Sequence, residues 1–279
     1  MIESYFQRKD AYNVVLDVTP ELAEAWLTHC NSHNRNLIDG HVDCLVREMK
    51  AGRWRLTHQG IAFSRNRVLL DGQHRLWAIV LSGVTVRMRV FFNESTETLD
   101  AIDAVRSRTN DQIISLAGGY GKVHRAELAT LRAMITGLGS YARRTANEEA
   151  ELFGRHRDAI LFAHEILPTA RVRGIATAVV RAVLARAYYV VDHDELRHFA
   201  TVLQSSVSSG EYDQPIVLLL QFLWSAAQGR RGRPEARECY GKTERALEAY
   251  LTGRTLHRLY ATTAELFPLP EETNASSAA

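Results

Sequence analysis

The sequence predicts an α+β fold in which a mixed N-terminal domain is followed by an all-α C-terminal domain. Strand-like and helix-like apolar patterns alternate through the first 117 of the 279 residues. Three glycines then occur within positions 118–121, which is typical of a linker. Beyond them, apolar residues recur only at helical spacing. The expected domains are therefore residues 1–117 and 122–268, and we expect the tail over 269–279 to be disordered.

Capping and turn signals set the order of the elements in the first domain. Thr19 can cap a helix that has Pro20 at its first position. Asn66 tolerates the left-handed backbone of a hairpin turn over 64–67. The expected elements are a strand at 14–18, a helix from 20, a helix at 40–51, strand-like residues at 54–56 and 61–63, a strand at 68–70, a helix whose apolar spacing resumes at 76, a closing strand at 84–91 and a helix at 97–104.

The second domain is punctuated by glycine and proline between segments of helical spacing, as in Leu128, Leu131 and Ile135. No internal repeat is visible. The expected helices lie near 123–138, 147–166, 174–191, 194–207, 215–228, 235–252 and 254–265.

The stretch Val68–Ala78 carries the clearest functional signal. An acid, a glycine, an amide, a histidine and an arginine occupy positions 71–75, between an apolar strand and a helix. The cluster is therefore expected at a strand-to-helix turn, where Gly72 permits close approach of a ligand to the backbone. The helix start offers unpaired N–H groups and a positive dipole end, as in phosphate sites. The alternative is an ordinary turn with a polar surface.

The same stretch resembles the signature box of the ParB/sulfiredoxin superfamily, in the residues Leu70-Asp71-Gly72-Gln73-His74-Arg75-Leu76-x-Ala78. The resemblance covers about residues 10–115 and includes Asn34-Arg35-Asn36 and Gly60–Phe63. It is closest to stand-alone ParB-like proteins of bacteria and their phages. The box departs from that of partition proteins, which usually have Glu-Arg where this chain has Gln73-His74. The cysteine of the sulfiredoxin box is replaced by Gln73, so its thiol chemistry does not carry over.

The resemblance implies a ParB/sulfiredoxin-like domain that binds a nucleoside triphosphate, ATP or CTP, together with Mg²⁺. In this interpretation Arg75 grips phosphate oxygens with its planar guanidinium and His74 stabilises developing charge. Asp71 holds Mg²⁺ or positions the nucleophile, because phosphoryl transfer depends mostly on placement and charge neutralisation. Gly72 and Gln73 contact the nucleotide or the substrate.

Three further groups are expected at the nucleotide cleft through the same resemblance. Each group also has a structural alternative. The first group can cap a helix through its asparagine, the second can be a solvated loop, and the third can be a basic helix end that complements its own dipole. The groups are Asn34 with Arg35; Thr57, His58 and Gln59; and Arg106 with Arg108.

Two functions of different classes follow from this interpretation. The first is an NTP-dependent phosphotransferase or NTPase that acts in DNA or nucleotide modification. The second is a nucleotide-gated DNA-binding protein without phosphotransfer to a substrate. A structural adaptor that has lost nucleotide affinity is a third, which the intact residues 71, 72, 74 and 75 disfavour. No helix-turn-helix pattern is visible, which weakens the interpretation as a partition factor.

Charge and composition are compatible with these partners. Residues 35–89 contain ten basic and four acidic residues, a balance of +6, whereas the whole chain carries +2. This favours an anionic partner, a nucleotide or DNA, although a solvated basic face is the alternative. No apolar run suits a bilayer, and the three widely spaced cysteines fit a reducing cytoplasm. The helical domain could contact substrate, DNA or a second subunit in a homodimer.

Three patterns in the second half have simpler explanations. Gly241-Lys242-Thr243 lacks the glycine that a P-loop needs five positions earlier, where Ala236 stands. His193 and His198 are five residues apart and do not share one helical face, which disfavours a metal site. The basic loop over 229–233 could contact a nucleic-acid backbone or serve as a solvated connector.

Overall fold

The computed structural model describes residues 2–32, 34, 36–96, 108–117, 119–168, 174–208, 210–228 and 235–270. The chain divides into two compact units. The first comprises Met1–Arg108 with Arg143–Thr145, and the second comprises Thr109–Ala142 with Ala146–Ala279. The predicted boundary at the glycines 118–121 is therefore wrong. Helix α5 (Asn110–Ala117) precedes those glycines but packs on α7 (Ala146–Ile166) of the second unit, with Ile114 buried in the core of that unit.

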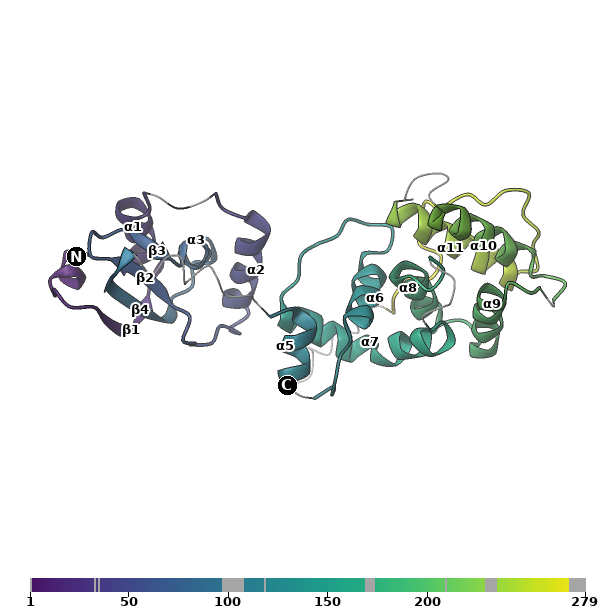
Figure 1. The fold of residues 1–279 in the computed structure, drawn as a ribbon, viewed down its shortest axis with the longest axis horizontal. Helices are drawn as coiled ribbons and strands as arrows, with labels where there is room; N and C mark the ends of the chain where they lie inside the picture. The colour runs from purple at the N-terminus through teal and green to yellow at the C-terminus, as the bar shows by residue number, and fades with distance from the viewer. Residues whose placement is uncertain are drawn as a thin grey trace, which may run out of the picture. The chain divides into compact units, whose positions relative to one another are not determined.

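The first unit combines a four-stranded sheet with three α-helices in the described residues (Figure 1). Its elements are η1 (Ile2–Phe6), β1 (Tyr12–Val18), α1 (Pro20–Cys30), α2 (Asp39–Lys50), β2 (Ile61–Ser64), β3 (Leu69–Asp71), α3 (Gln73–Ser82) and β4 (Val86–Glu94). Thr19 caps α1 as predicted, since its side chain accepts a hydrogen bond from the backbone of Leu22. The sequence therefore predicts the order of the elements from β1 to β4 correctly, except for strand-like residues 54–56, which lie outside the sheet. The short helix η1 is not predicted.

The sheet has the strand order β1-β4-β2-β3. Strand β4 is central, because it pairs antiparallel with β1 and parallel with β2. Strand β3 pairs antiparallel with β2 at the edge, where Ala62 faces Asp71. The end of β3, and the polar residues that follow it, therefore lie at an edge of the sheet.

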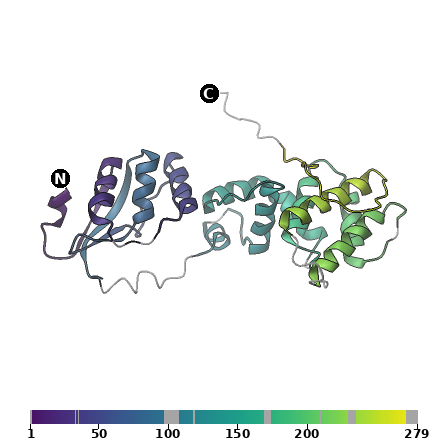
Figure 2. The ribbon, with the colours of Figure 1, turned by 90° about the horizontal axis from the view of Figure 1, so that it is seen from above.

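One face of the sheet is covered by helices. Residues 86, 88, 90 and 92 of β4 alternate inward and join Trp26 of α1 and Ile79 of α3 in one core. Helix α3 packs against both α1 and α2. Figure 2 shows these three helices side by side, with α3 in the middle. The helix that follows the polar cluster is thus fixed on both flanks.

The turn between β2 and β3 differs from the prediction in one residue. Arg67, not Asn66, adopts the left-handed backbone, with φ of 61°. The buried Ser64 hydroxyl accepts hydrogen bonds from the backbone N–H groups of Asn66 and Val68. The Ser64 side chain organises the turn, and the left-handed backbone position falls on Arg67.

The second unit is helical in its described residues. Its helices are α5 and then α6 (Arg125–Thr136), α7 (Ala146–Ile166), α8 (Ala178–Ala187), α9 (His193–Ser205), α10 (Gln214–Ala227) and α11 (Ala236–Leu251). Helix α8 is the centre, because it packs against α6, α7 and α11 and its residues from Val180 onward are buried (Figure 1). The predicted helix over 254–265 is wrong, since residues 252–270 contain neither helix nor strand.

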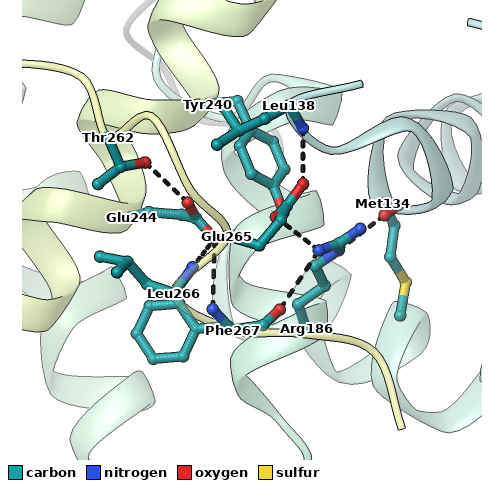
Figure 3. Close-up of polar contacts among 9 residues, drawn as sticks. All are labelled: Met134, Leu138, Arg186, Tyr240, Glu244, Thr262, Glu265, Leu266 and Phe267. Carbon is teal, nitrogen blue, oxygen red and sulfur yellow. Dashed lines mark hydrogen bonds and ion pairs between the residues drawn. The ribbon is translucent and has the colours of Figure 1, made fainter. Parts of the chain in front are cut away.

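Buried polar side chains explain why the chain after α11 is not helical. Glu244 is fully buried on α11, and its carboxylate accepts hydrogen bonds from the backbone N–H groups of Leu266 and Phe267 at 3.1 and 3.4 Å (Figure 3). Thr262 donates its hydroxyl to the same carboxylate at 2.9 Å. Burial raises the pKa of Glu244, against the opposing effect of these three donors. Side-chain acceptors replace the helical partners of these backbone groups.

A second set of contacts fixes the same segment to α6 and α8. Arg186 is buried and donates to Glu265 at 2.6 Å and to the carbonyl oxygen of Met134 at 2.7 Å (Figure 3). Glu265 also accepts from the backbone of Leu138 at 2.7 Å and from the Tyr240 hydroxyl at 3.1 Å. The irregular segment is therefore part of the core structure of this unit.

No helix in the described ranges is both long enough and apolar enough to cross a membrane.

We predict that Glu244→Ala lowers the free energy of unfolding by about 3 kcal/mol, because buried donors lose their acceptor. Glu165→Ala, which removes an exposed carboxylate paired with Arg197, should cost less than about 1 kcal/mol. Urea unfolding of the full chain measures both. Equal losses for the two variants would contradict the role of Glu244.

Candidate functional site

The predicted strand-to-helix turn is confirmed. Strand β3 ends at Asp71, Gly72 follows as the N-cap residue, and α3 begins at Gln73. Gly72 has a left-handed backbone with φ of 104°, and no side chain caps the first turn of α3. The N-terminal end of the helix therefore presents backbone N–H groups that no capping side chain satisfies.

Gly72 is required by packing as well as by conformation. A Cβ atom at this position would lie 3.0 Å from Cγ1 and 3.1 Å from Cα of Ile61 in β2. The φ angle is one that residues with a side chain rarely adopt. The sequence-based interpretation of Gly72 as room for a ligand is thus incomplete, because the neighbouring strand already accounts for the glycine.

Arg75 and Asp71 form an ion pair across this turn. Nη2 of Arg75 lies 2.9 Å from Oδ2 of Asp71. The arginine side chain is 17% exposed and the aspartate 43%. Nε of Arg75 is buried and has no hydrogen-bond partner among the described residues. One guanidinium nitrogen is therefore committed to Asp71, while the buried Nε–H has no acceptor among the described residues.

His74 connects the turn to the start of α2. Its Nε2 accepts a hydrogen bond of 3.2 Å from the backbone N–H of Ile38, the N-cap residue of α2. Its ring also meets the ring of His41 edge-on, with centroids 5.2 Å apart. A nitrogen that accepts a hydrogen bond carries no proton, so the neutral ring of His74 holds its proton on Nδ1.

These side chains line one pocket with a volume of about 290 Å³, close to the lower end of the range for ligand sites. All five residues of the cluster at 71–75 contribute to it. The lining residues are Ile38, His41, Asp71, Gly72, Gln73, His74, Arg75 and, from the segment 143–145 of the same unit, Arg143.

The sequence gives no sign of Ile38 and His41 as members of this pocket. They lie 36 and 33 positions before His74 in the chain, and no motif surrounds them. Only the packing of α2 against α3 brings them to the cluster. Local sequence patterns cannot report such a contact.

Asn34 lies beside the site in a structural role. Its side-chain amide donates hydrogen bonds to Oδ1 of Asn31 at 2.7 Å and to the carbonyl oxygen of Leu69 at 2.8 Å. It therefore ties the loop before α2 to the first residue of β3, and it is not among the residues that line the pocket. Arg35, predicted with it, lies outside the described residues.

Thr57, His58 and Gln59 are exposed and do not line the pocket. The Thr57 hydroxyl exchanges hydrogen bonds with the backbone of Gln59 and so shapes its own loop. The next residue, Gly60, is required by packing, because a Cβ there would overlap the carbonyl oxygen of Arg89 in β4. The structure thus brings 71–75 together and leaves 57–59 apart from them.

The remaining candidates divide between described and undescribed residues. Arg108 is exposed, whereas Arg106 and the expected helix at 97–104 lie outside the described residues. In the second unit, His198 pairs with the buried Asp213 at 2.7 Å, and His193 stacks on Tyr188. Within the described ranges, no three His, Cys, Asp or Glu side chains form a cluster that could hold a metal ion.

Comparison of the chain with protein-family models, with curated proteins and with solved structures gave no match.

We predict that Gly72→Ala destabilises the first unit more than Gly83→Ala does. Both glycines flank α3 with a left-handed backbone, but Gly83 has open space where a Cβ would be added. Gly83→Ala should cost about 1–2 kcal/mol for the backbone alone, and Gly72→Ala at least about 1 kcal/mol more. Urea unfolding of both variants measures the difference, and equal costs would contradict the packing role of Gly72.

Proposed function

We propose that the first unit is a ParB/sulfiredoxin-like domain that binds a nucleoside triphosphate, ATP or CTP, at the N-terminal end of α3. We further propose that it uses this nucleotide as a phosphotransferase or NTPase in DNA or nucleotide modification. The observation that carries the proposal is that residues 71–75 all line one pocket, at an uncapped helix start.

The phosphate chain is assigned to the first turn of α3. Backbone N–H groups and the positive end of a helix dipole favour an anion at such a position. Arg75 adds the positive charge of its guanidinium, which lines the same pocket. A guanidinium and a helix start that share one pocket suit the spread charge of a phosphate group.

His74 contributes through its orientation. Its Nε2 accepts a hydrogen bond from the backbone N–H of Ile38. The same hydrogen bond keeps the imidazole in place, so little orientational freedom is lost when charge develops nearby. His74 is therefore proposed to stabilise charge, and Ile38 to position it.

The residues present fit a Mg²⁺ ion that arrives with the nucleotide. Mg²⁺ in nucleotide sites is held by one or two carboxylates, phosphate oxygens and several waters. Asp71 offers this carboxylate, because Arg75 engages only Oδ2 and Oδ1 contacts no described hydrogen-bond donor. The bound ion would neutralise charge on the phosphate oxygens.

In the proposed reaction the γ-phosphorus forms a bond to an acceptor oxygen and its bond to the bridging oxygen breaks. The acceptor is water in an NTPase, or a hydroxyl or acid group in a phosphotransferase. The diphosphate leaves with the bond's electron pair, and the acceptor loses its proton. Arg75, His74 and the α3 amides would act by placing the phosphates and stabilising their charge, which is most of what phosphoryl transfer requires.

Nucleotide-gated DNA binding is the second candidate, and it is favoured by exposed cations on the first unit. Arg55, Arg65 and Arg87 are exposed and form no ion pair with a described residue. Such side chains can contact a phosphate backbone, with an affinity that falls as salt rises. DNA binding that responds to nucleotide without any release or transfer of phosphate would identify this second function.

We predict that one nucleoside triphosphate with Mg²⁺ raises the melting temperature of the first unit. At a hundred times the dissociation constant the stabilisation is about 2.7 kcal/mol, which calorimetry resolves. ATP, CTP, GTP and ADP are compared, each with and without Mg²⁺. Arg75→Ala should abolish the shift measured from its own ligand-free state, and Asp71→Asn should remove its dependence on Mg²⁺.

Arg65→Ala is the matched control, since Arg65 is an exposed arginine that does not line the pocket. It should keep the full shift. Phosphate release, measured with the nucleotide that binds, then separates the two functions. No shift with any nucleotide, or an unchanged shift in Arg75→Ala, would contradict the proposal.

A further inference from the structure

The second unit contains a larger groove that the proposed function does not use. It has a volume of about 730 Å³, within the range of ligand sites. Three walls form it: one face of α10, the first turns of α11 and the irregular segment 257–261. Figure 1 shows α10 and α11 side by side, as their mutual contacts require. We call this the α10–α11 groove.

The α10 wall combines apolar and polar side chains and carries no charge. The lining residues Leu218, Gln221, Phe222 and Ser225 have the spacing of one helical face. The opposite face of α10, with Leu219 and Leu223, is buried in the core. Helix α10 has no charged residue along its whole length, although one face lies in the groove. The half-buried Leu218 and Phe222 therefore lie beside the polar Gln221 and Ser225 in a wall without charge.

The facing wall carries positive charge. Nζ of Lys242 lies 3.9 Å from the ring centroid of Phe222 and 2.7 Å from Oε1 of Glu238. Its positive charge is therefore paired with the carboxylate of Glu238 and lies over an aromatic ring. Arg258 is exposed and pairs with no described residue. His257 is exposed beside it. The charged lining side chains therefore sum to a net positive charge, which Arg258 supplies, and they favour an anionic ligand.

Tyr260 places an aromatic ring in the same groove, and 64% of the residue is exposed. The segment that carries it is anchored at both ends. Oε1 of Gln214 accepts a hydrogen bond from the backbone N–H of Leu256 at 2.9 Å, and Nε2 of Gln214 donates one to the carbonyl oxygen of Leu256 at 2.7 Å. Thr262 bonds the carbonyl oxygen of Gly241 at 3.2 Å. The backbone that carries Tyr260 and Arg258 is thus held at both ends before any ligand binds, which lowers the entropic cost of binding.

We propose that the α10–α11 groove binds single-stranded nucleic acid. An exposed aromatic ring two positions along the chain from an arginine that pairs with no described residue is an arrangement on which a base can stack while its phosphate is neutralised. On the α10 wall, Leu218 and Phe222 offer apolar contact to further bases, and Gln221 and Ser225 offer hydrogen bonds at their edges. The groove is separate from the nucleotide pocket, so this proposal does not depend on the proposed function.

The test is fluorescence anisotropy of a labelled twelve-residue oligothymidylate with the full chain at low salt. Tyr260→Ala should weaken binding about tenfold, because one stacked base is lost. Tyr260→Phe keeps the ring and should restore most of the affinity. Arg258→Ala should weaken binding and reduce the slope of log affinity against log salt by about one phosphate contact. Melting curves establish that each variant folds.

Arg197→Ala is the control, because Arg197 is an exposed cation on α9 outside the groove. It should leave affinity unchanged. Thymidine monophosphate serves as a competitor. Weak competition, seen only at high concentration, indicates that the groove binds a nucleic-acid strand. Competition equal to that of the unlabelled oligonucleotide indicates a single-nucleotide site in the same groove. No binding, binding unaffected by Tyr260→Ala, or equal competition by polyglutamate would overturn the proposal.

Discussion

The architecture of the first unit depends on the close approach of Gly72 to Ile61. This contact forces a glycine at the end of β3, and the left-handed backbone of that glycine directs the chain straight into α3. The approach also fixes where the uncapped end of α3 lies, at the edge of the sheet and next to the start of α2. Helix α3 is held between two other helices, so its first turn presents backbone donors on a rigid base. The pocket is a consequence of this packing.

The second unit depends on a different constraint, which is the burial of carboxylates in a helical core. Glu244 is fully buried and can remain so only because backbone and hydroxyl donors surround it. Those donors belong to the irregular segment after α11, which is thereby fixed against the helices. The same segment carries Tyr260 and Arg258 into the α10–α11 groove. An interaction that stabilises the core therefore also builds a candidate binding surface.

The sequence predicts the local features of this protein well and the contacts between distant residues poorly. Apolar periodicity and capping residues give the helix and strand order of the first unit, and the density of polar residues at 71–75 gives the turn. The predicted helix at 254–265 fails because contacts with distant residues hold this segment: Gln214 bonds the backbone of Leu256, and Thr262 bonds Gly241 and Glu244. The membership of His41 in the pocket is invisible for a related reason, because only helix packing brings it to His74.

The central claim is that an anionic group binds at the first turn of α3. Amide chemical shifts of the ¹⁵N-labelled full chain, followed while Mg²⁺-nucleotide or tripolyphosphate is added, test it most directly. The account predicts that the amides of Gln73, His74 and Arg75 shift most and saturate together, and that Arg75→Ala weakens the response. Saturation of amides elsewhere, with these three unchanged, would contradict it.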